Sequence, residues 1–177
     1  MGFFATTSIF VNATEFTNEL RLCYHYGCSK QVSFEVSEAG RARLAEIFSD
    51  VGHANAERKA IADAIVELYR EAAAHAPISA DKGGNFGDGS ADGRMDCVDH
   101  SENDTTFMRY LAGQGWLRHH RVEKPAWRAP WIVDLHYASR LTDAQSGEAW
   151  IVDSWFFDFG HKPVVLPYQQ WKKGYTP

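Results

Sequence analysis

Cys97, His136 and Asp153 are the residues whose types and order could perform nucleophilic chemistry. A cysteine attacks as its thiolate, so it needs a base and a position that favours negative charge. Cys97 follows a glycine-rich segment and begins a predicted helix, where the helix dipole favours the thiolate over the thiol. His136 would take the thiol proton and later donate it to the leaving group, while Asp153 would fix its tautomer and orientation. The sequence therefore predicts a Cys-His-Asp triad.

The same three residues also have a structural interpretation. Cys97 could be a small buried hydrophobe, which is the commoner role of a free cysteine. His136 could be a hydrogen-bonded histidine within a strand, and Asp153 a polar residue that ends a strand beside Ser154.

A predicted hairpin must bring His136 and Asp153 together, because they lie on two strands joined by a connector of turn-forming residues. If Leu141 pairs with Glu148, His136 lies directly opposite Asp153 and both side chains share a face of the sheet. A slip of one residue would place Ser154 opposite His136 instead. The geometry of the pair thus depends on the strand register.

Hydrophobic periodicity and helix-capping residues predict the elements around this hairpin. Strands are expected over residues 20–26 and 32–36. Helices are expected over 37–49 with Ser37 as N-cap, over 55–75, and from Asp96 or Cys97 to just before Gly113. Further strands are expected over 117–122, 131–141 and 149–157. Helices concentrated in the first half and an antiparallel sheet in the second half indicate an α+β fold.

The chain has 177 residues, 45% of them hydrophobic, and a formal net charge of −5. This predicts a single domain over residues 1–177, with a strand and helix half (1–76), a Gly- and Asp-rich loop (77–95), and a catalytic helix with its sheet (96–177). A mildly acidic chain without a basic face is not expected to bind nucleic acid. No apolar run approaches the roughly 18 residues that span a bilayer, so we expect no transmembrane segment.

Cys23 and Cys28 lie five residues apart across a predicted turn. In an oxidising compartment they can form a small disulfide, whereas in the cytoplasm they would remain two thiols. The first residues lack the basic start and apolar stretch of a secretory signal. A cytoplasmic location therefore stays open, as does a periplasmic or secreted one if the disulfide forms.

The glycine-rich loop suggests a calcium site as an alternative, because it offers oxygen ligands at Asp81, Asn85, Asp88 and Asp92. The loop departs from the EF-hand template, because Phe86 stands where glycine is required and no glutamate stands at position twelve. A flexible loop beside the candidate helix is the better interpretation.

Zinc is a second metal alternative, with ligands drawn from Cys97, His100, His119, His120 and His136. No second closely spaced pair completes a tetrahedral set, and adjacent histidines on a strand point to opposite faces. The sequence thus predicts no metal and no other cofactor. Most of the six tryptophans are expected in the core, but Trp155 could instead wall the site and exclude water.

Three short motifs carry a family resemblance: Asp96-Cys97-Val98-Asp99 at a helix start, His136-Tyr137-Ala138 on a strand, and Val152-Asp153-Ser154-Trp155 on the next. Over about residues 93–171 the chain resembles the transglutaminase-like branch of the papain-like cysteine protein superfamily, in particular bacterial transglutaminase-like proteins. Segments 57–65, 116–120 and 167–171 are also similar to that bacterial group.

The resemblance implies a papain-like fold in which a nucleophile at a helix N-terminus packs on an antiparallel sheet. It implies hydrolysis or acyl transfer on an amide or isopeptide bond by a Cys97 thiol, with a peptide, protein or peptidoglycan-like amide as substrate. The superfamily also contains binding domains without activity, which is the alternative function. Papain-type enzymes place a glutamine before the nucleophile, but none occurs between Gln31 and Cys97. Backbone N–H groups at the helix start would therefore have to stabilise the oxyanion.

Overall fold

The computed structural model describes residues 18–85, 91–130 and 135–177. Its elements are β1 (Glu19–Tyr24), β2 (Lys30–Glu35), α1 (Glu38–Ile47), α2 (Ala54–Ala72), the 3-10 turn η1 (Ile78–Ala80), α3 (Cys97–Gly113), β3 (His120–Val122), β4 (Ala126–Arg128), β5 (His136–Asp143), β6 (Ala149–Asp153), β7 (Val164–Pro167) and α4 (Tyr168–Lys172). Every strand pairing among these elements is antiparallel, so the fold is α+β, as predicted.

Side-chain caps set where the long helices start. The Ser37 hydroxyl accepts the Gly40 N–H at α1, which confirms the predicted cap. At α2 the cap is His53, whose Nδ1 accepts a backbone N–H, and at α3 it is Asp96. Helix α2 ends at Ala72, three residues before the predicted end.

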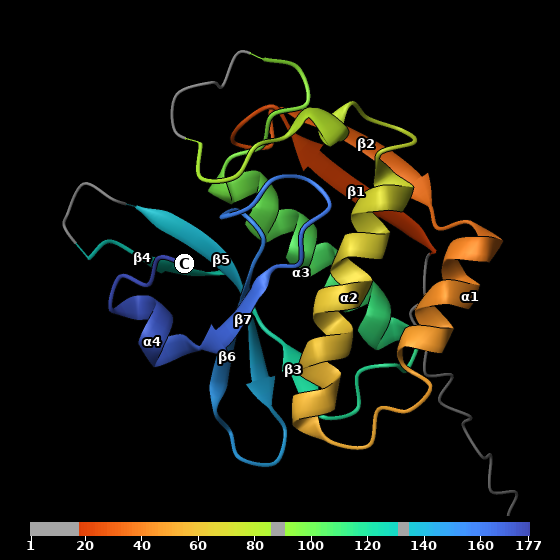
Figure 1. Ribbon diagram of the computed structural model, residues 1–177, viewed down its shortest axis with the longest axis vertical. Helices are drawn as coiled ribbons and strands as arrows, with labels where there is room; N and C mark the ends of the chain where they lie inside the picture. The colour runs from red at the N-terminus through yellow and green to blue at the C-terminus, as the bar shows by residue number, and fades with distance from the viewer. Residues whose placement is uncertain (1–17, 86–90, 131–134) are drawn as a thin grey trace, which may run out of the picture.

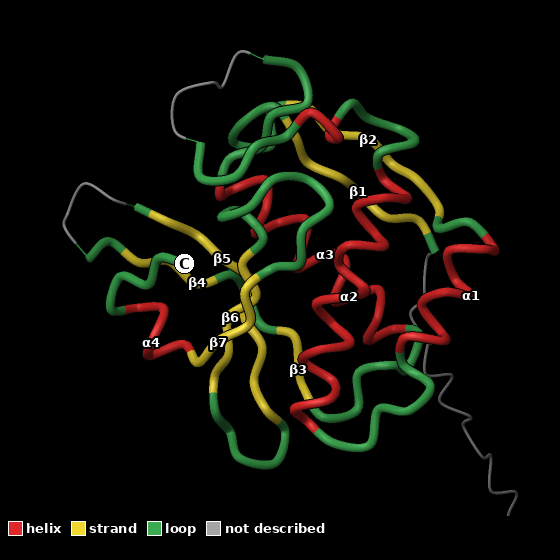
Figure 2. The backbone as a smooth tube through the Cα atoms, in the orientation of Figure 1, coloured by secondary structure: helices red, strands yellow, loops and turns green. Residues whose placement is uncertain are grey.

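The strands form two sheets. Strands β1 and β2 pair with each other alone, and the larger sheet has the order β3-β5-β6-β7, with β4 also paired to β5. Strands β3 and β4 pair with successive parts of β5: β3 with Leu141 to Asp143, and β4 with His136 to Ala138. In Figure 1, α3 lies between the larger sheet at the left and helices α1 and α2 at the right, and Figure 2 shows the same separation of strands and helices.

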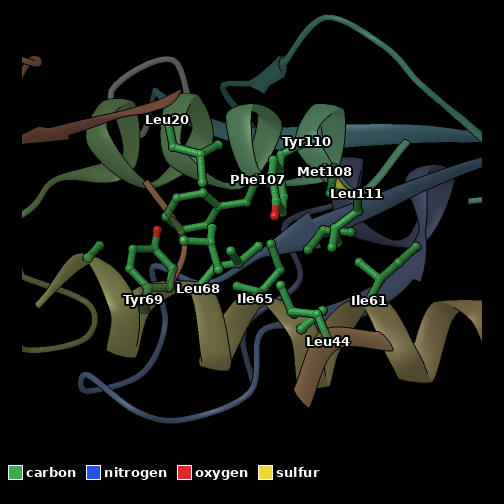
Figure 3. Packing of buried hydrophobic residues seen from close by; sticks show 14 of the residues in the cluster. Leu20, Leu44, Ile61, Ile65, Leu68, Tyr69, Phe107, Met108, Tyr110 and Leu111 are labelled. Carbon is green, nitrogen blue, oxygen red and sulfur yellow. The ribbon is translucent and has the colours of Figure 1, made fainter. Parts of the chain in front are cut away.

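The core lies between α2 and α3 (Figure 3). From α2, Ile61, Ile65 and Leu68 point toward Phe107 and Leu111 of α3, and all five side chains are fully buried. The spacing of three and four residues within each set puts it on one helix face. Because α3 also packs on β5, this core fixes the start of α3 relative to the sheet.

The structure differs from the predicted strands mainly at their ends. The strand predicted at 131–141 runs from His136 to Asp143, and residues 131–134 lie outside the described residues. The strand predicted at 149–157 ends at Asp153, because the chain turns at Trp155. Strands β4 and β7 and helix α4 were not predicted, since elements of three to five residues are too short to show a period.

Candidate active site

Cys97 is the first residue of α3, held by a reciprocal cap. The Asp96 carboxylate accepts the N–H groups of Val98 (3.0 Å) and Asp99 (2.9 Å), and the Asp99 carboxylate accepts the Asp96 N–H (3.1 Å). These bonds fix the first turn of the helix. They leave the N–H of Cys97 itself outside the cap, close to its own Sγ.

His136 and Asp153 form the buried hydrogen bond that the sequence predicted. His136 Nε2 lies 2.7 Å from Asp153 Oδ2, and both side chains are about 1% exposed. With Nε2 donating to the carboxylate, Nδ1 of the neutral ring is the acceptor. Nδ1 is buried and has no hydrogen-bond partner in the part of the chain that the structure describes. Asp153 thus sets the tautomer of the His136 ring and leaves Nδ1 as the ring nitrogen that can accept a proton.

The predicted register of the hairpin was wrong by two residues. Leu141 lies opposite Trp150, not Glu148, and the β5–β6 ladder ends where Ser139 meets Val152. His136 therefore reaches Asp153 diagonally instead of directly across. A shift of two residues keeps every side chain on its original face, so the contact survives the error.

Aromatic rings enclose the His136–Asp153 pair. The His136 ring centroid lies 4.6 Å from that of Trp155, 5.5 Å from Phe156 and 5.8 Å from Trp171. Trp171 Nε1 also donates to Asp153 Oδ2 (2.9 Å), and the Trp155 N–H donates to Oδ1 (3.3 Å). Trp155 thus walls this pair, as predicted, and water is kept from the hydrogen bond between ring and carboxylate.

Cys97 reaches this pair through the backbone of β5. The Tyr137 N–H, one residue beyond His136, lies near enough to the Cys97 thiol to lower its pKa, and the Asp153 carboxylate lies near enough to raise it. Cys97 is partly exposed, so a reagent can reach it. Sγ and His136 Nδ1 are not hydrogen-bonded to each other. The structure thus brings the three predicted residues to one end of α3, without a hydrogen bond between Cys97 Sγ and His136 Nδ1.

The predicted preference for the thiolate is not met. Burial raises the pKa of the Cys97 thiol, and the carboxylates of Asp96 and Asp153 raise it further, while the Tyr137 N–H lowers it less. The helix start therefore does not ionise this thiol by itself, and any thiolate near neutral pH has to come from proton transfer to a base.

The turn between β1 and β2 is hydrogen-bonded to the start of α3. Cys23 and Cys28 form a disulfide, one of the two alternatives left open by the sequence. The Gly27 N–H donates to Asp96 Oδ2 (3.0 Å) and the Cys28 N–H to Asp99 Oδ1 (2.7 Å). Consecutive residues of this turn have left-handed φ angles between 58° and 69°, at His25, Tyr26, Gly27 and Cys28. This conformation turns N–H groups toward the two carboxylates of the cap.

The structure adds a buried polar network that the sequence did not reveal. His100 Nδ1 lies 2.7 Å from Ser154 Oγ, and Nε2 lies 3.0 Å from Asp81 Oδ2. Ser154 Oγ also donates to Asp104 Oδ2 (2.8 Å). Burial raises the pKa of Asp104 to about 7, although nearby His100 opposes this. No local pattern in the sequence signals this network, because residues 99–106 are an unbroken run of polar residues that does not show which of them are buried.

Several residues of the two metal alternatives are engaged by protein groups, whereas the Asn85 amide is buried and has no hydrogen-bond partner among the described residues. Both ring nitrogens of His100 are hydrogen-bonded, and His120 Nδ1 lies 2.9 Å from Glu57 Oε1. In the glycine-rich loop, the Asp81 carboxylate accepts the Met95 N–H and Asp92 pairs with a lysine, while Phe86 and Asp88 lie outside the described residues. No cluster of three metal-ligating side chains occurs within residues 18–85, 91–130 and 135–177.

The tryptophans divide between core and surface. Trp171 and Trp155 are buried, and Trp116 and Trp150 are partly buried. Trp127 is the exception among the described tryptophans, since it is 60% exposed on the short strand β4, and Trp131 lies outside the described residues.

Comparison of the chain with protein-family models, with curated proteins and with solved structures finds no match. Over the described residues, no helix has the length and apolar character needed to span a membrane.

Proposed function

We propose that this protein is a cysteine-dependent hydrolase or acyltransferase acting on an amide or isopeptide bond, with Cys97, His136 and Asp153 as its triad in a papain-like, transglutaminase-like arrangement. The observation that carries the proposal is the His136–Asp153 pair, with Nδ1 lacking a hydrogen-bond partner among the described residues and with Asp153 and the backbone N–H of Tyr137 both near enough to the Cys97 thiol to shift its pKa. A buried histidine held by a carboxylate at one nitrogen and available at the other is what a general base requires.

In the proposed reaction the Cys97 proton passes to His136 Nδ1, and Sγ bonds to the carbonyl carbon of the amide. The Cys97 N–H, outside the helix cap, donates to the oxyanion. His136 then returns the proton to the leaving amine, the C–N bond breaks and a thioester remains on Cys97. Attack by water completes hydrolysis, and attack by another amine completes acyl transfer. The substrate amide is expected in a peptide, protein or peptidoglycan-like polymer.

A non-catalytic binding domain is the alternative function. Two observations favour it: burial raises the pKa of the Cys97 thiol, and Sγ is not bonded to Nδ1. Apo sites often tighten only when substrate binds, so the second observation weighs less than the first. For either function, the Cys23–Cys28 disulfide favours a protein that acts in an oxidising compartment.

Acylation by p-nitrophenyl acetate separates the two functions. Under non-reducing conditions Cys97 is the free cysteine, so peptide mapping assigns an acetyl thioester directly. The enzyme should release p-nitrophenolate in a burst, and His136→Ala should slow the burst by at least about 100-fold, the usual contribution of general-base catalysis. His119→Ala, a half-buried histidine away from the triad, should leave the burst unchanged. Equal rates for wild type and His136→Ala would establish the binding domain instead.

A further inference from the structure

The His100 network lies directly behind the candidate triad and joins its two halves. On one side, Asp81 Oδ1 accepts the N–H of Met95 (2.8 Å), two residues before Cys97. On the other side, Ser154 follows Asp153 in the chain. His100 bonds to both Asp81 and Ser154, and it lies on α3 itself. A single imidazole thus connects the segment before the nucleophile to the end of the strand that carries the carboxylate.

The contacts of this network resemble a Ser-His-Asp triad, but the site cannot admit a substrate. Ser154, His100 and Asp81 are 7%, 4% and 1% exposed. The cavity beside them, which Tyr69 and Met95 also line, has a volume of about 10 Å³. This is room for one water molecule. A nucleophilic serine would need an open path for the carbonyl carbon of its substrate. The network is therefore placed to hold the segments around Cys97 and Asp153, and not to react.

Ser154 Oγ and both ring nitrogens of His100 are hydrogen-bonded, which restrains the centre of the network, whereas the buried Asp104 Oδ1 has no hydrogen-bond partner among the described residues. Ser154 Oγ contacts His100 Nδ1 and Asp104 Oδ2, and the Tyr69 hydroxyl lies 3.4 Å from both Oγ and Nδ1. A proton on either His100 or Asp104 satisfies the same set of bonds, because the hydroxyl of Ser154 can donate in either direction. Buried hydrogen bonds at the centre of a network favour one arrangement of the elements that they join.

We propose that Asp81, His100 and Ser154 are positioning residues that hold the Asp153 carboxylate, and with it His136, in register with Cys97. The inference rests on the proposed function. Without the network, the end of β6 would keep its ladders with β5 and β7 and the bonds of Asp153 to His136 and Trp171, but it would lose its link to the segment before Cys97. The carboxylate would then orient His136 less well, and less thiolate would form near neutral pH.

A double-mutant cycle between Ser154→Ala and Asp153→Asn tests this inference. The readout is the ratio of Cys97 alkylation rates by iodoacetamide at pH 7 and pH 10, which cancels changes in simple accessibility. We expect Asp153→Asn to lower the ratio about 5-fold and Ser154→Ala about 2-fold, and the double variant to match Asp153→Asn, because residues acting through one another are not additive.

Ser139→Ala is the matched control. Ser139 is a fully buried serine whose hydroxyl donates to the Ser101 carbonyl of α3 and lies 2.8 Å from Thr105 Oγ1, outside the His100 network. Its loss should reduce thermal stability as Ser154→Ala does, but leave the alkylation ratio unchanged. If Ser154→Ala does not fold, Asp81→Asn, which keeps the acceptor for Met95, replaces it in the same cycle.

The possible failures are distinguishable. An unchanged ratio in Asp153→Asn would overturn the proposed function. A lowered ratio in Asp153→Asn, with no effect of Ser154→Ala or with an additive double variant, would overturn the positioning role alone. Labelling of Ser154 by a fluorophosphonate would show that Ser154 is itself a nucleophile, and would also overturn it.

Discussion

The side chain of Asp153 accepts hydrogen bonds from three parts of the chain: β5, α4 and the residues that directly follow β6. His136 Nε2 and Trp171 Nε1 share Oδ2, and the Trp155 N–H donates to Oδ1. Two donors on one oxygen leave the carboxylate little freedom to rotate. The tautomer and direction of His136 therefore depend on Trp171 as well as on Asp153.

The contribution of Trp171 can be measured by removing its N–H alone. Trp171→Phe keeps an aromatic ring beside His136 but loses the bond to Asp153. We expect a loss of about 1 kcal/mol in the free energy of unfolding, as for one buried hydrogen bond, and a lowered rate of Cys97 alkylation at pH 7. Denaturant unfolding and alkylation kinetics measure the two effects.

Trp150→Phe is the control for this change. Trp150 Nε1 is buried and has no hydrogen-bond partner in the described part of the chain, so its removal breaks no such bond. A drop in the alkylation rate of equal size in Trp150→Phe would show that Trp171 acts through packing, not through Asp153.

At the scale of elements, the β1–β2 turn and the start of α3 form one unit. The disulfide closes the turn, and the Gly27 and Cys28 N–H groups hold the two carboxylates that cap the helix. The cap in turn sets the position of Cys97. The disulfide should therefore affect the reactivity of Cys97 through the helix cap, without direct contact with Cys97.

Replacing both disulfide cysteines tests this coupling. Cys23→Ala/Cys28→Ala should lower the free energy of unfolding by about 2 kcal/mol, the loop-closure value for so short a loop. Hydrogen exchange of the first turn of α3 should become faster, whereas exchange at its end, near Leu111, should not change. Unchanged exchange at the first turn would mean that the turn only rests against the helix.

Elements with strong local signals could be predicted from the sequence, and contacts between them could not. The cap at Ser37, the start of α3 at Asp96 or Cys97 and the apolar face of α2 follow from neighbouring residues, and the structure confirms them. The pairing of His136 with Asp153 was predicted from a wrong register, and it holds only because the error was an even number of residues. The network of His100 joins three distant segments, so no local pattern could reveal it.

At the scale of the whole molecule, buried groups with raised pKa values make stability depend on pH near neutrality. Burial raises the pKa of Asp104 to about 7 and that of Asp99 to about 6. Burial lowers the pKa of His100, but the hydrogen bond and charge of Asp81 outweigh this and the net pKa is raised. In each case the folded protein holds a proton at a pH where the unfolded chain has lost it.

Stability should therefore fall as the pH rises through these folded pKa values. A group with a raised folded pKa contributes stability that is present at low pH and lost above that pKa. Between pH 6 and pH 8 we expect a loss of about 1–3 kcal/mol, since one proton accounts for at most about 1.4 kcal/mol per pH unit. Urea unfolding across this range measures it. Asp104→Asn should flatten the dependence and the exposed Asp50→Asn should not, whereas equal slopes in wild type and Asp104→Asn would contradict this assignment.

The most direct test of the central claim is the pH profile of Cys97 alkylation in wild type and in His136→Ala. Because burial raises the pKa of the thiol, thiolate near neutral pH requires transfer of its proton to His136. We expect His136→Ala to slow alkylation about 10-fold or more at pH 6 to 7 and little at pH 10, where the thiol ionises unaided. Asp153→Asn should give a smaller change in the same direction, provided that circular dichroism shows both variants folded. An identical pH profile in wild type and His136→Ala would show that Cys97 and His136 are not a catalytic pair.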